Sequence, residues 1–303
     1  MKVSALDSVG GWISHLFEYI SGSLKEVTFE VYALEDIKAA DGESEDYYKK
    51  DDLIATITTD ETGVAKLTDI PLGKYYVKEK ETANGYVLDS TAREIDLTYR
   101  DQDTAEVTYS SDWQNNRQKA EVKVLKKEKD SDRVLEGAVF ALCNKEDIVN
   151  ANGDVILKAD TVIEEQATDK EGKLTFTADL PIGYTYYVKE TSPAPGFATT
   201  DQVQEFTFEY DGADKETLSY EFTFEDEPTV VEITKTSLTD GKELEGAKLE
   251  VTDEDGKVVD SWTSGKEAHI IKELVAGKKY TLTETKPADG YVTAESITFT
   301  VED

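Results

Sequence analysis

Three ionisable residues stand where an alternating strand pattern places apolar side chains. They are Lys126, Glu190 and Asp226, each in a different segment of the chain. The residues two and four positions before them are apolar or aromatic: Val124 and Val122, Val188 and Tyr186, Phe224 and Phe222. Residues two apart along a strand share a face, so all three side chains are expected to point into a core. A buried charge without a partner is costly, which favours a fold in which the three meet.

Such a cluster has the parts needed to form an amide bond. Burial disfavours charged forms, and a neutral lysine amine is a nucleophile. A protonated Glu190 beside it can polarise the Asp226 carbonyl and transfer protons. The product would be an amide between Lys126 and Asp226 with one water released, and an Asn acceptor would release ammonia instead. The same spacing is also compatible with a buried ion-pair network that does no covalent chemistry.

The strand that carries Glu190 occurs three times in the chain. The copies read YYVKE at 75–79, YYVKE at 186–190 and YTLTE at 280–284, and each has a Gly six residues after its Glu. Self-similarity of this kind indicates tandem copies of one structural unit. Short alternating segments separated by turn residues indicate antiparallel sandwiches. We therefore predict an all-β chain of three tandem antiparallel β-sandwich domains in a rod-like array.

The boundaries follow from the repeats. The predicted domains are residues 1–118, 119–228 and 229–303. The first has an atypical opening strand without a lysine, the second has the complete Lys/Glu/Asp set, and the third lacks its last strand. The linkers, residues 116–119 and 227–229, are short, so hinge motion should be restricted. Residues 168–173 (TDKEGK) are predicted to form a hairpin turn between two strands.

The first repeat carries an incomplete set. Glu79 precedes Asn115 by 36 residues, the interval that also separates the Glu and Asp of the second repeat, so Asn115 is the matching acceptor. The position that corresponds to Lys126 is occupied by His15, and no lysine lies between residues 2 and 25. The first repeat should therefore not be cross-linked, unless a shift of register brings Lys2 to Asn115.

The third repeat is incomplete in the opposite way. Lys235 precedes Leu249 by 14 residues, the interval between Lys126 and Phe140 in the second repeat, so Lys235 is the matching lysine. Glu284 is the matching glutamate. The acceptor position, 36 residues after Glu284, falls beyond the last residue of the chain. Lys235 and Glu284 are thus expected to lack an acceptor within this chain.

These motifs together resemble the CnaB domains, also called SpaA-like prealbumin-type domains, of Gram-positive surface adhesins and pilins. The resemblance covers nearly the whole chain and rests on four motifs. They are the lysine strand at residues 233–236, the Leu-Glu-Gly-Ala step at 135–138 and 244–247, the Tyr-x-x-x-Glu strand described above, and the Pro-x-x-Gly-Tyr that follows it at 287–291. In that family a self-generated Lys–Asn or Lys–Asp isopeptide bond joins the first and last strands, with a Glu as catalyst. The resemblance implies that Lys126 and Asp226 are the bonded pair and that Glu190 is the catalytic residue. The third repeat also resembles the domain from which split peptide-ligation tags were made.

An apolar stretch near the N-terminus is harder to interpret. Residues 11–20 (GWISHLFEYI), within the longer segment 9–24, are predicted to form the first strand of the first domain. The alternative is an amphipathic helix or an added binding segment that displaces that strand. His15 is expected to be packed or exposed rather than catalytic, and His269, in an alternating run, to be structural.

Composition argues against several classes of function. A net charge of −32 disfavours binding to nucleic acid or to anionic membrane surfaces, and no apolar run is long enough to span a membrane. Cys143 is the only cysteine, so no intrachain disulfide is expected. With two His residues in the chain, no metal site of the usual kind and no cofactor is predicted. The acidic loop at residues 253–256 lacks the spacing of an EF-hand, and weak calcium binding there stays open.

The predicted function is a structural stalk or shaft segment of a bacterial surface adhesin or pilin. The alternative is a ligand-binding adhesin module that uses the aromatic N-terminal stretch or the open strand edge of the third domain. Its partner would be a host or cell-surface protein, or a strand-donating peptide at the third domain. A conventional enzyme is not predicted, because no nucleophile elbow, phosphate loop or His-based triad is visible and the bond-forming reaction would be single-turnover.

Location and assembly are predicted from the resemblance. It implies an extracellular protein, anchored to the cell wall in its parent, although neither the apolar region of a signal peptide nor a sorting motif occurs in this sequence. As a fragment, the chain is expected to be a monomer.

Overall fold

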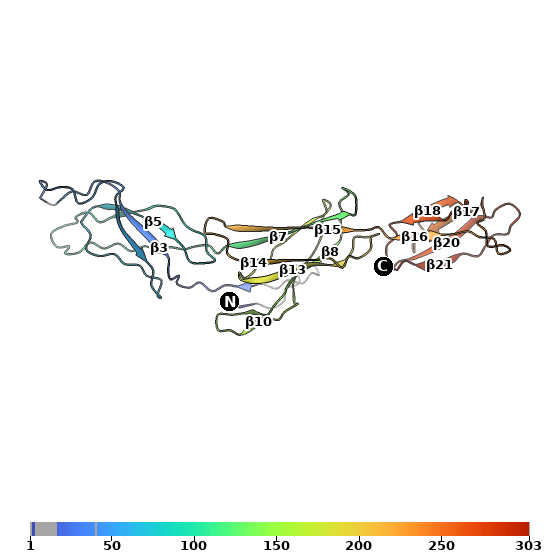
Figure 1. Ribbon diagram of the computed structural model, residues 1–303, viewed down its shortest axis with the longest axis horizontal. Helices are drawn as coiled ribbons and strands as arrows, with labels where there is room; N and C mark the ends of the chain where they lie inside the picture. Colours follow the sequence, from blue (N-terminus) through green and yellow to red (C-terminus); the bar gives the residue numbers. More distant parts are fainter. Residues whose placement is uncertain (1, 4–16, 40, 303) are drawn as a thin grey trace.

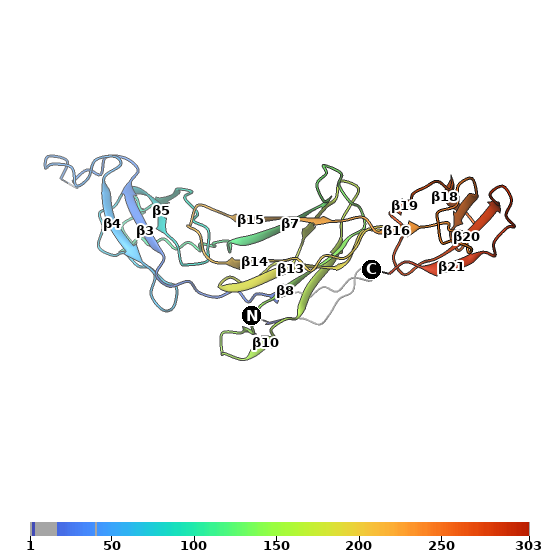
Figure 2. The same ribbon diagram turned by 45° about the vertical axis from the view of Figure 1, so that its right-hand side comes forward.

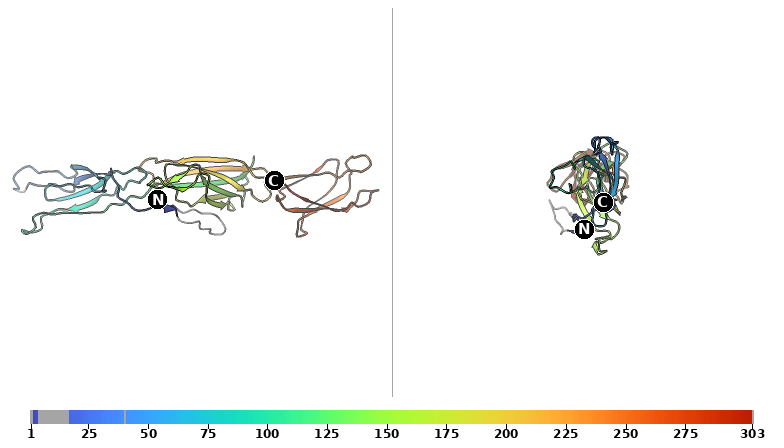
Figure 3. Two further views of the ribbon diagram at one scale, coloured as in Figure 1. Left: turned by 90° about the horizontal axis from the view of Figure 1, so that it is seen from below. Right: turned by 90° about the vertical axis from the view of Figure 1, so that its left-hand side faces the viewer.

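The computed structural model describes residues 2–3, 17–39 and 41–302, which form strands, turns and loops. Figures 1 and 2 show three groups of strands that follow one another along the long axis. The end-on view in Figure 3 shows that the rod is narrow. The predicted rod-like array of three all-β, sandwich-type domains is therefore confirmed. No helix that could cross a bilayer is present in the described part of the chain.

Domain 2, in the middle of the rod, is a sandwich of two sheets. The larger sheet has the order β11-β8-β13-β14, with strands Val162–Ala167, Val139–Asn144, Tyr184–Ser192 and Val203–Phe208. The smaller sheet has the order β12-β7-β15, with strands Lys173–Phe176, Lys119–Glu128 and Thr217–Asp226. A short pair, β9 (Ile148–Val149) and β10 (Val155–Leu157), lies outside both sheets.

The first and last strands of domain 2 run parallel. β7 pairs with β15 over the whole length of both, whereas the other strand pairs of domain 2 are antiparallel. The chain enters β7 from domain 1 and leaves β15 toward domain 3, so both strands point the same way along the rod (Figure 1). The two strands that connect domain 2 to its neighbours are thus also next to each other.

Alternating side chains build the core between the two sheets. In β12, Leu174 and Phe176 are buried while the residues before each of them are exposed. In β15, Phe224 is fully buried and packs on Phe140 of the opposite sheet, with ring centroids 4.8 Å apart. Aromatic and β-branched residues suit such a half-buried pleated surface, which explains why these segments form strands.

The predicted hairpin at residues 168–173 is wrong, because the turn carries the chain from one sheet to the other. β11 ends in the larger sheet and β12 begins in the smaller one. The turn itself is local, with Gly172 N donating to Asp169 O. The crossing is stabilised at longer range: the buried Glu164 accepts hydrogen bonds from the backbone N–H of Thr177 and Ala178, each at 2.8 Å.

In its described residues, domain 1 contains one sheet where domain 2 has two. Its order is β4-β3-β5-β6, with strands Leu53–Thr58, Thr28–Ala33, Lys74–Glu81 and Arg93–Asp96. Within the described residues, the segments 64–67 and 106–115, which follow β4 and β6, belong to no strand ladder. They still cover the core, because Leu67 and Trp113 pack against Phe29 and its neighbours.

Domain 3 repeats the sandwich plan. Its larger sheet has the order β18-β17-β20-β21, with strands Val258–Thr263, Lys248–Thr252, Lys279–Lys286 and Ile297–Thr300. Its second sheet is a pair, β16 (Val230–Ile233) with β19 (His269–Lys272). The other edge of β16 has no strand beside it in the part of domain 3 that the structure describes.

The N-terminal segment, where described, does not form the first strand of domain 1. β1 (Lys2–Val3) pairs with β2 (Phe17–Glu18), and Phe17 is buried in the core of domain 2. Tyr19 donates its hydroxyl to Asp179 O at 2.8 Å and lies under the Arg117 guanidinium. The first-strand interpretation is therefore wrong for residues 17–19, because Phe17 and Tyr19 pack against domain 2, and Ile20, which follows them, is exposed. Residues 4–16, including His15, lie outside the described part of the chain.

The junction between domains 1 and 2 is fixed by polar side chains. Gln118, in the linker, is 1% exposed. Its Nε2 donates to Gly212 O and Lys215 O at 3.1 and 2.8 Å, and its Oε1 accepts from Asp211 N at 3.0 Å. Arg117 forms an ion pair with Asp179. Because a buried amide group is satisfied only by domain 2, the linker is held against that domain.

The junction between domains 2 and 3 is fixed in the same manner. Arg133 of domain 2 makes a bidentate ion pair with Glu273 of domain 3, at 2.5 and 2.9 Å. The buried Thr229 donates from its N–H to Gly196 O and from its hydroxyl to Leu274 O. Gly196 has φ +89°, and a Cβ there would lie 2.7 Å from Glu273 O. The backbones of the two domains therefore meet without room for a side chain.

Gly196→Ala is expected to loosen the junction between domains 2 and 3. The added methyl group meets Glu273 O, so the bond from Thr229 N to Gly196 O should weaken and the Thr229 and Glu273 amides should exchange faster with solvent. Gly246→Ala is the control, because Gly246 has the same φ of +89° and no atom near the added Cβ. Equal exchange at both amides in the two variants would contradict the steric argument.

Candidate functional site

The chemistry-bearing residues of domain 2 meet inside the sandwich. Lys126 lies in β7, the central strand of the smaller sheet, and is completely buried. Its Nζ lies 2.9 Å from Glu190 Oε1 and makes an ion pair with Asp226 Oδ1. All three side chains are fully shielded from solvent. The residues that the strand pattern predicted to point inward are thus brought together.

Pairing between strands sets this geometry. In the parallel ladder, Lys126 is opposite Phe224, so Asp226 is two residues further along β15 on the same face. Glu190 reaches the cluster from the other sheet, where β13 pairs it with Phe140 of β8. The amine therefore receives one carboxylate from its own sheet and one from the facing sheet.

Aromatic rings exclude water around the cluster. Phe140 and Phe224 pack on each other, and Lys126 Nζ lies 5.6 Å from the centroid of the Phe140 ring. Ionic contacts are much stronger in such an apolar setting than at a surface. The same setting makes transfer of a proton between the partners favourable relative to leaving charges buried.

Glu190 has the perturbed acidity expected of a proton-transfer group. Burial raises the pKa of Glu190 from 4.5 to about 7, although its contact with Lys126 and a hydrogen bond from Thr200 N act to lower it. A carboxyl group with a pKa near neutrality can both give and take a proton at physiological pH. Glu190 can thus move a proton between the amine and the acceptor carboxyl.

A backbone donor ten residues after each glutamate escaped the sequence analysis. Glu190 Oε2 accepts from Thr200 N at 3.1 Å, Glu79 Oε2 from Asp89 N at 2.7 Å and Glu284 Oε2 from Ala294 N at 2.5 Å. In each domain the Gly six residues after the Glu has φ between +86° and +89° and turns the chain back toward the carboxylate. The repeated spacing of six residues between Glu and Gly could have predicted this donor, because a turn at the glycine returns the backbone to the strand that carries the glutamate.

Domain 1 pairs its glutamate with an amide. Asn115 Nδ2 donates to both carboxylate oxygens of Glu79, at 2.8 and 2.7 Å, and to Val87 O at 2.9 Å. Glu79 is 3% exposed. Within the described chain no lysine forms an ion pair with it. The backbone of Lys2 pairs with Glu18 in the segment beside domain 2.

Domain 3 contains the lysine and the glutamate. Lys235 Nζ lies 3.2 Å from Glu284 Oε1, with Glu284 buried and the lysine side chain 19% exposed. Both residues line a pocket of about 80 Å³, together with Ile233, Leu249 and Leu282. The three predicted sets thus occur as a complete cluster, a Glu–Asn pair and a Lys–Glu pair.

The other residues noted in the sequence have structural surroundings. His269 contacts Asp260 at 2.8 Å and stacks on Trp262, and Cys143 is buried. Asp253 Oδ1 accepts hydrogen bonds from two backbone N–H groups of its own turn. No grouping of three His, Cys, Asp or Glu side chains suited to a metal occurs among the described residues.

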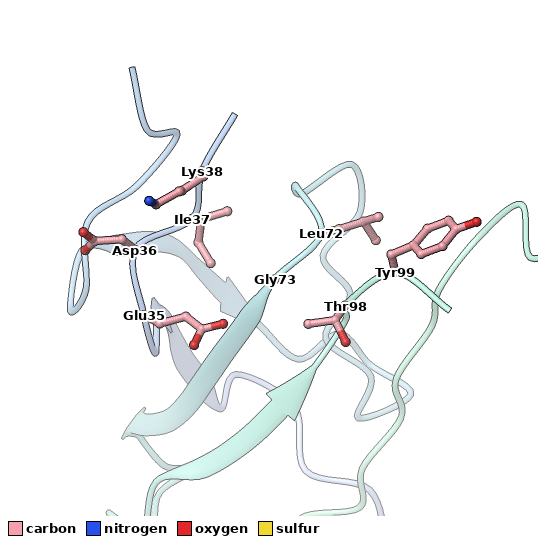
Figure 4. A pocket seen from close by; sticks show the side chains of 8 residues that line it. All are labelled: Glu35, Asp36, Ile37, Lys38, Leu72, Gly73, Thr98 and Tyr99. Carbon is pink, nitrogen blue, oxygen red and sulfur yellow. The ribbon is translucent and has the colours of Figure 1, made fainter. Parts of the chain in front are cut away.

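A separate hollow lies in domain 1, beyond β3. Figure 4 shows acidic and basic side chains on one side of it and Leu72 and Tyr99 on the other. Its volume is about 270 Å³, and Glu35, Asp36 and Lys38 are among its lining residues. It contains neither Glu79 nor Asn115. The hollow therefore lies apart from the Glu–Asn pair.

Comparisons with known proteins agree with the fold. A family model described as SpaA, a prealbumin-like fold domain, matches residues 20–113, 120–222 and 229–303. No curated protein gave a significant match.

Among solved structures, the Bacillus anthracis TIE protein is 26% identical with a TM-score of 0.56; the match covers 93% of this chain and 46% of that one. The chain thus spans about half the length of that relative. BcpA, the major pilin subunit of Bacillus cereus, is 16% identical with a TM-score of 0.40, and the match covers 92% of this chain and 91% of BcpA. The shaft pilin SpaA of Lactobacillus rhamnosus GG is 17% identical with a TM-score of 0.30, covering 61% and 94%.

The raised pKa of Glu190 can be tested in an Asp226→Ala variant, which has no acceptor carboxyl for the amide. We expect the free energy of unfolding of this variant to fall as the pH rises. The native state holds this proton more tightly than the unfolded chain. The contribution of Glu190 is therefore fully present below about pH 4.5 and is lost as the pH rises through about 7. Relative to Asp226→Ala/Glu190→Gln, the free energy of unfolding of Asp226→Ala should therefore fall as the pH rises across this range.

Urea unfolding of both variants between these pH values, with domain 2 followed by amide exchange, measures the difference. A difference that stays constant with pH would mean that Glu190 does not hold a proton in the folded state.

Proposed function

The chain belongs to the SpaA family of prealbumin-like fold domains, and from this premise we propose that it is a structural segment of a bacterial surface adhesin or pilus. Its middle domain would be closed by an intramolecular amide between Lys126 and Asp226. The observation that carries this proposal is the cluster in domain 2. Three fully buried ionisable side chains are in contact there. Two of them, Lys126 and Asp226, are on the strands through which the chain enters and leaves the domain, and Glu190 is on β13 of the facing sheet.

The reaction balances with the groups present. A proton passes from the Lys126 ammonium to the Asp226 carboxylate by way of Glu190, which leaves a neutral amine and a neutral acid. Lys126 Nζ attacks Asp226 Cγ and the new C–N bond forms. Glu190 takes the second proton from this nitrogen and gives it to the leaving oxygen as the Cγ–O bond breaks. One water leaves and Glu190 is unchanged. The reaction happens once per chain, so the protein is not proposed to be an enzyme.

The bond would change how the rod carries tension. Force applied along the rod enters β7 at Lys119 and leaves β15 after Asp226. Lys126 and Asp226 are 100 residues apart in sequence, so an amide between them removes the intervening segment from the path of the force. By analogy with a disulfide that closes a loop of this length, it should stabilise the domain by about 4–5 kcal/mol.

The composition supports a location at the cell surface. Cys143 is the only cysteine, so an intrachain disulfide cannot brace the chain. An amide supplies a covalent brace that needs no oxidising partner. A net charge of −32 keeps an exposed rod soluble and disfavours association between copies. We propose that the parent protein is extracellular and attached to the cell wall.

Intact mass under denaturing conditions tests the bond directly. The purified chain should weigh one water less than its sequence mass, and peptide mapping should place the loss between Lys126 and Asp226. Most molecules of Glu190→Ala should have the full sequence mass, because the residue that transfers the proton is missing and the amide forms poorly. All molecules of Lys126→Arg should have the full sequence mass, because the variant has no amine to form the amide.

Asp226→Asn adds a test of the acceptor, because the amide acceptor should lose ammonia in place of water. A full sequence mass in the unaltered protein would overturn the covalent proposal and leave domain 2 with a buried ion network.

The Lys–Glu pair of domain 3 supports a second candidate function, capture of a strand-donating peptide. Lys235 and Glu284 line a pocket beside the edge of β16 that has no neighbouring strand in the described chain. Exposed strand edges accept added strands. A synthetic peptide with the sequence of β15, Thr217–Asp226, should form an adduct at Lys235 with loss of one water.

A peptide with Asn in place of its last Asp should also react, with loss of ammonia, while one with Ala there should not. Failure of both reactive peptides, with Lys235→Arg as the matched background, would remove this candidate.

A further inference from the structure

Domain 1 reproduces the reaction centre of domain 2 with one component missing. The strands that carry Glu79 and Asn115 correspond to those that carry Glu190 and Asp226 at an offset of 111 residues, and the shared Asp-x-x-Gly turns, at 60–63 and 169–172, at an offset of 109. Glu79 pairs across its sheet with Phe29, as Glu190 does with Phe140. Trp113 packs on Phe29 with ring centroids 5.0 Å apart, in the manner of their counterparts in domain 2 at 4.8 Å. Asn115 thus occupies the place of Asp226.

The missing component is a cation. Glu190 and Glu284 each make an ion pair with a lysine of their own domain. Glu79 is as deeply buried, at 3% exposure, and no ion pair is formed with it by any lysine or arginine in the described chain. A buried carboxylate without a cation is costly, so this site has a vacant position for a positive group.

The described part of the chain also holds no strand in the place where the lysine would be carried. In domain 2, β7 lies between β12 and β15 and pairs with both. Their counterparts in domain 1 are residues 64–67 and 106–115, identified by the shared Asp-x-x-Gly turn and by the offset of 111. Neither segment is in a strand, and within residues 41–302 no strand lies between them. Among the described residues, both edges of this vacant strand position are therefore without a strand partner.

Contacts around the vacant position agree. A Cβ added at Gly172 of domain 2 would lie 2.6 Å from Lys126 O, and Leu135 N donates to that carbonyl oxygen at 3.0 Å. At the corresponding Gly63, the three atoms nearest to an added Cβ belong to Ser23 and Leu24, the counterparts of residues 134 and 135. None of these three nearest atoms is a carbonyl oxygen, whereas Lys126 O is the nearest atom at Gly172.

Apolar residues beside this position are incompletely covered. Leu174 and Phe176 are 6% and 5% exposed, whereas their counterparts Ala65 and Leu67 are only partly buried. Phe17, which precedes β3 in the chain, does not cover them, because it is buried in the core of domain 2.

We infer that domain 1 accepts a lysine-bearing β-strand from another chain and joins that lysine covalently to Asn115. The inference rests on the amide-forming chemistry proposed for domain 2. The domain supplies an acceptor amide, a buried carboxylate and two free strand edges, so the partner is defined by what is absent. It is an extended segment with a lysine and with apolar residues two and four positions before it.

The vacant position fixes how the partner strand runs. By the register of β7, the strand runs parallel to residues 106–115 and antiparallel to residues 64–67. Its lysine lies opposite Trp113, the counterpart of Phe224, and its Nζ then reaches both Glu79 and Asn115.

The reaction balances without any further reagent. Glu79 takes a proton from the incoming lysine ammonium, and the neutral amine attacks Asn115 Cγ. The Cγ–Nδ2 bond breaks as Glu79 gives that proton to Nδ2, and ammonia leaves. Glu79 then takes the second proton from the new amide nitrogen and ends protonated. The hydrogen bonds from Nδ2 to both Glu79 oxygens already place the carboxylate at the leaving group.

The test uses the whole chain and a synthetic probe. The probe is a peptide with the sequence of Lys119–Glu128 in which every lysine except that at position 126 is arginine. The control peptide has arginine at that position as well. After incubation, the denatured chain should gain the mass of the probe less one ammonia, and peptide mapping should place the bond at Asn115. Asn115→Ala and Glu79→Gln should each abolish the adduct, and the control peptide should give none with the unaltered protein.

Three outcomes would overturn the inference: no adduct with the probe, an adduct that persists in Asn115→Ala, or loss of ammonia from the chain alone, which would mean that its own lysine fills the site. The same spectrum records whether Lys126 and Asp226 have lost a water. Failure of the proposed function in domain 2 is therefore read separately from failure of the inference in domain 1.

Discussion

Each of the three domains is built around one buried carboxylate at the same place in its central strand. Glu79, Glu190 and Glu284 are 3%, 7% and 5% exposed, and each receives a backbone N–H from ten residues further on. A buried carboxylate is tolerated only with hydrogen bonds and a charge partner or a proton. The domains differ in how they meet this constraint: by an Asn amide, by a lysine and an aspartate, or by a lysine alone.

Local periodicity was enough to find much of this arrangement. The inward phase of Lys126, Glu190 and Asp226 could be predicted because side chains alternate strictly along a strand. The sheet crossing near residue 168 could not, because its turn has the chemistry of a hairpin turn and the bonds that redirect the chain come from Glu164. The position of Phe17 could not be predicted either, because an apolar pattern shows that a residue is buried and not which domain covers it.

The two junctions extend the same physical logic from the domains to the rod. Gln118 and Thr229 are buried polar residues in linkers, and their hydrogen-bond partners lie in the adjoining domains. A bent junction would leave these groups unsatisfied, so straight alignment is the arrangement that meets their bonding needs. Sequence alone gives short linkers, but it does not indicate which polar side chains will be buried between domains.

Domain 2 has an aspartate and domain 1 an asparagine at the acceptor position, and this difference follows from whether a lysine is present in the domain as it folds. Asp226 faces Glu190, and two buried carboxylates repel each other unless Lys126 lies between them, so this acceptor requires its lysine in place as the domain folds. Asn115 is neutral and donates to Glu79, so it holds the site together while no lysine is present. An aspartate at position 115 would instead set two carboxylates against each other. The amide acceptor is thus the one suited to a domain whose lysine arrives on another strand.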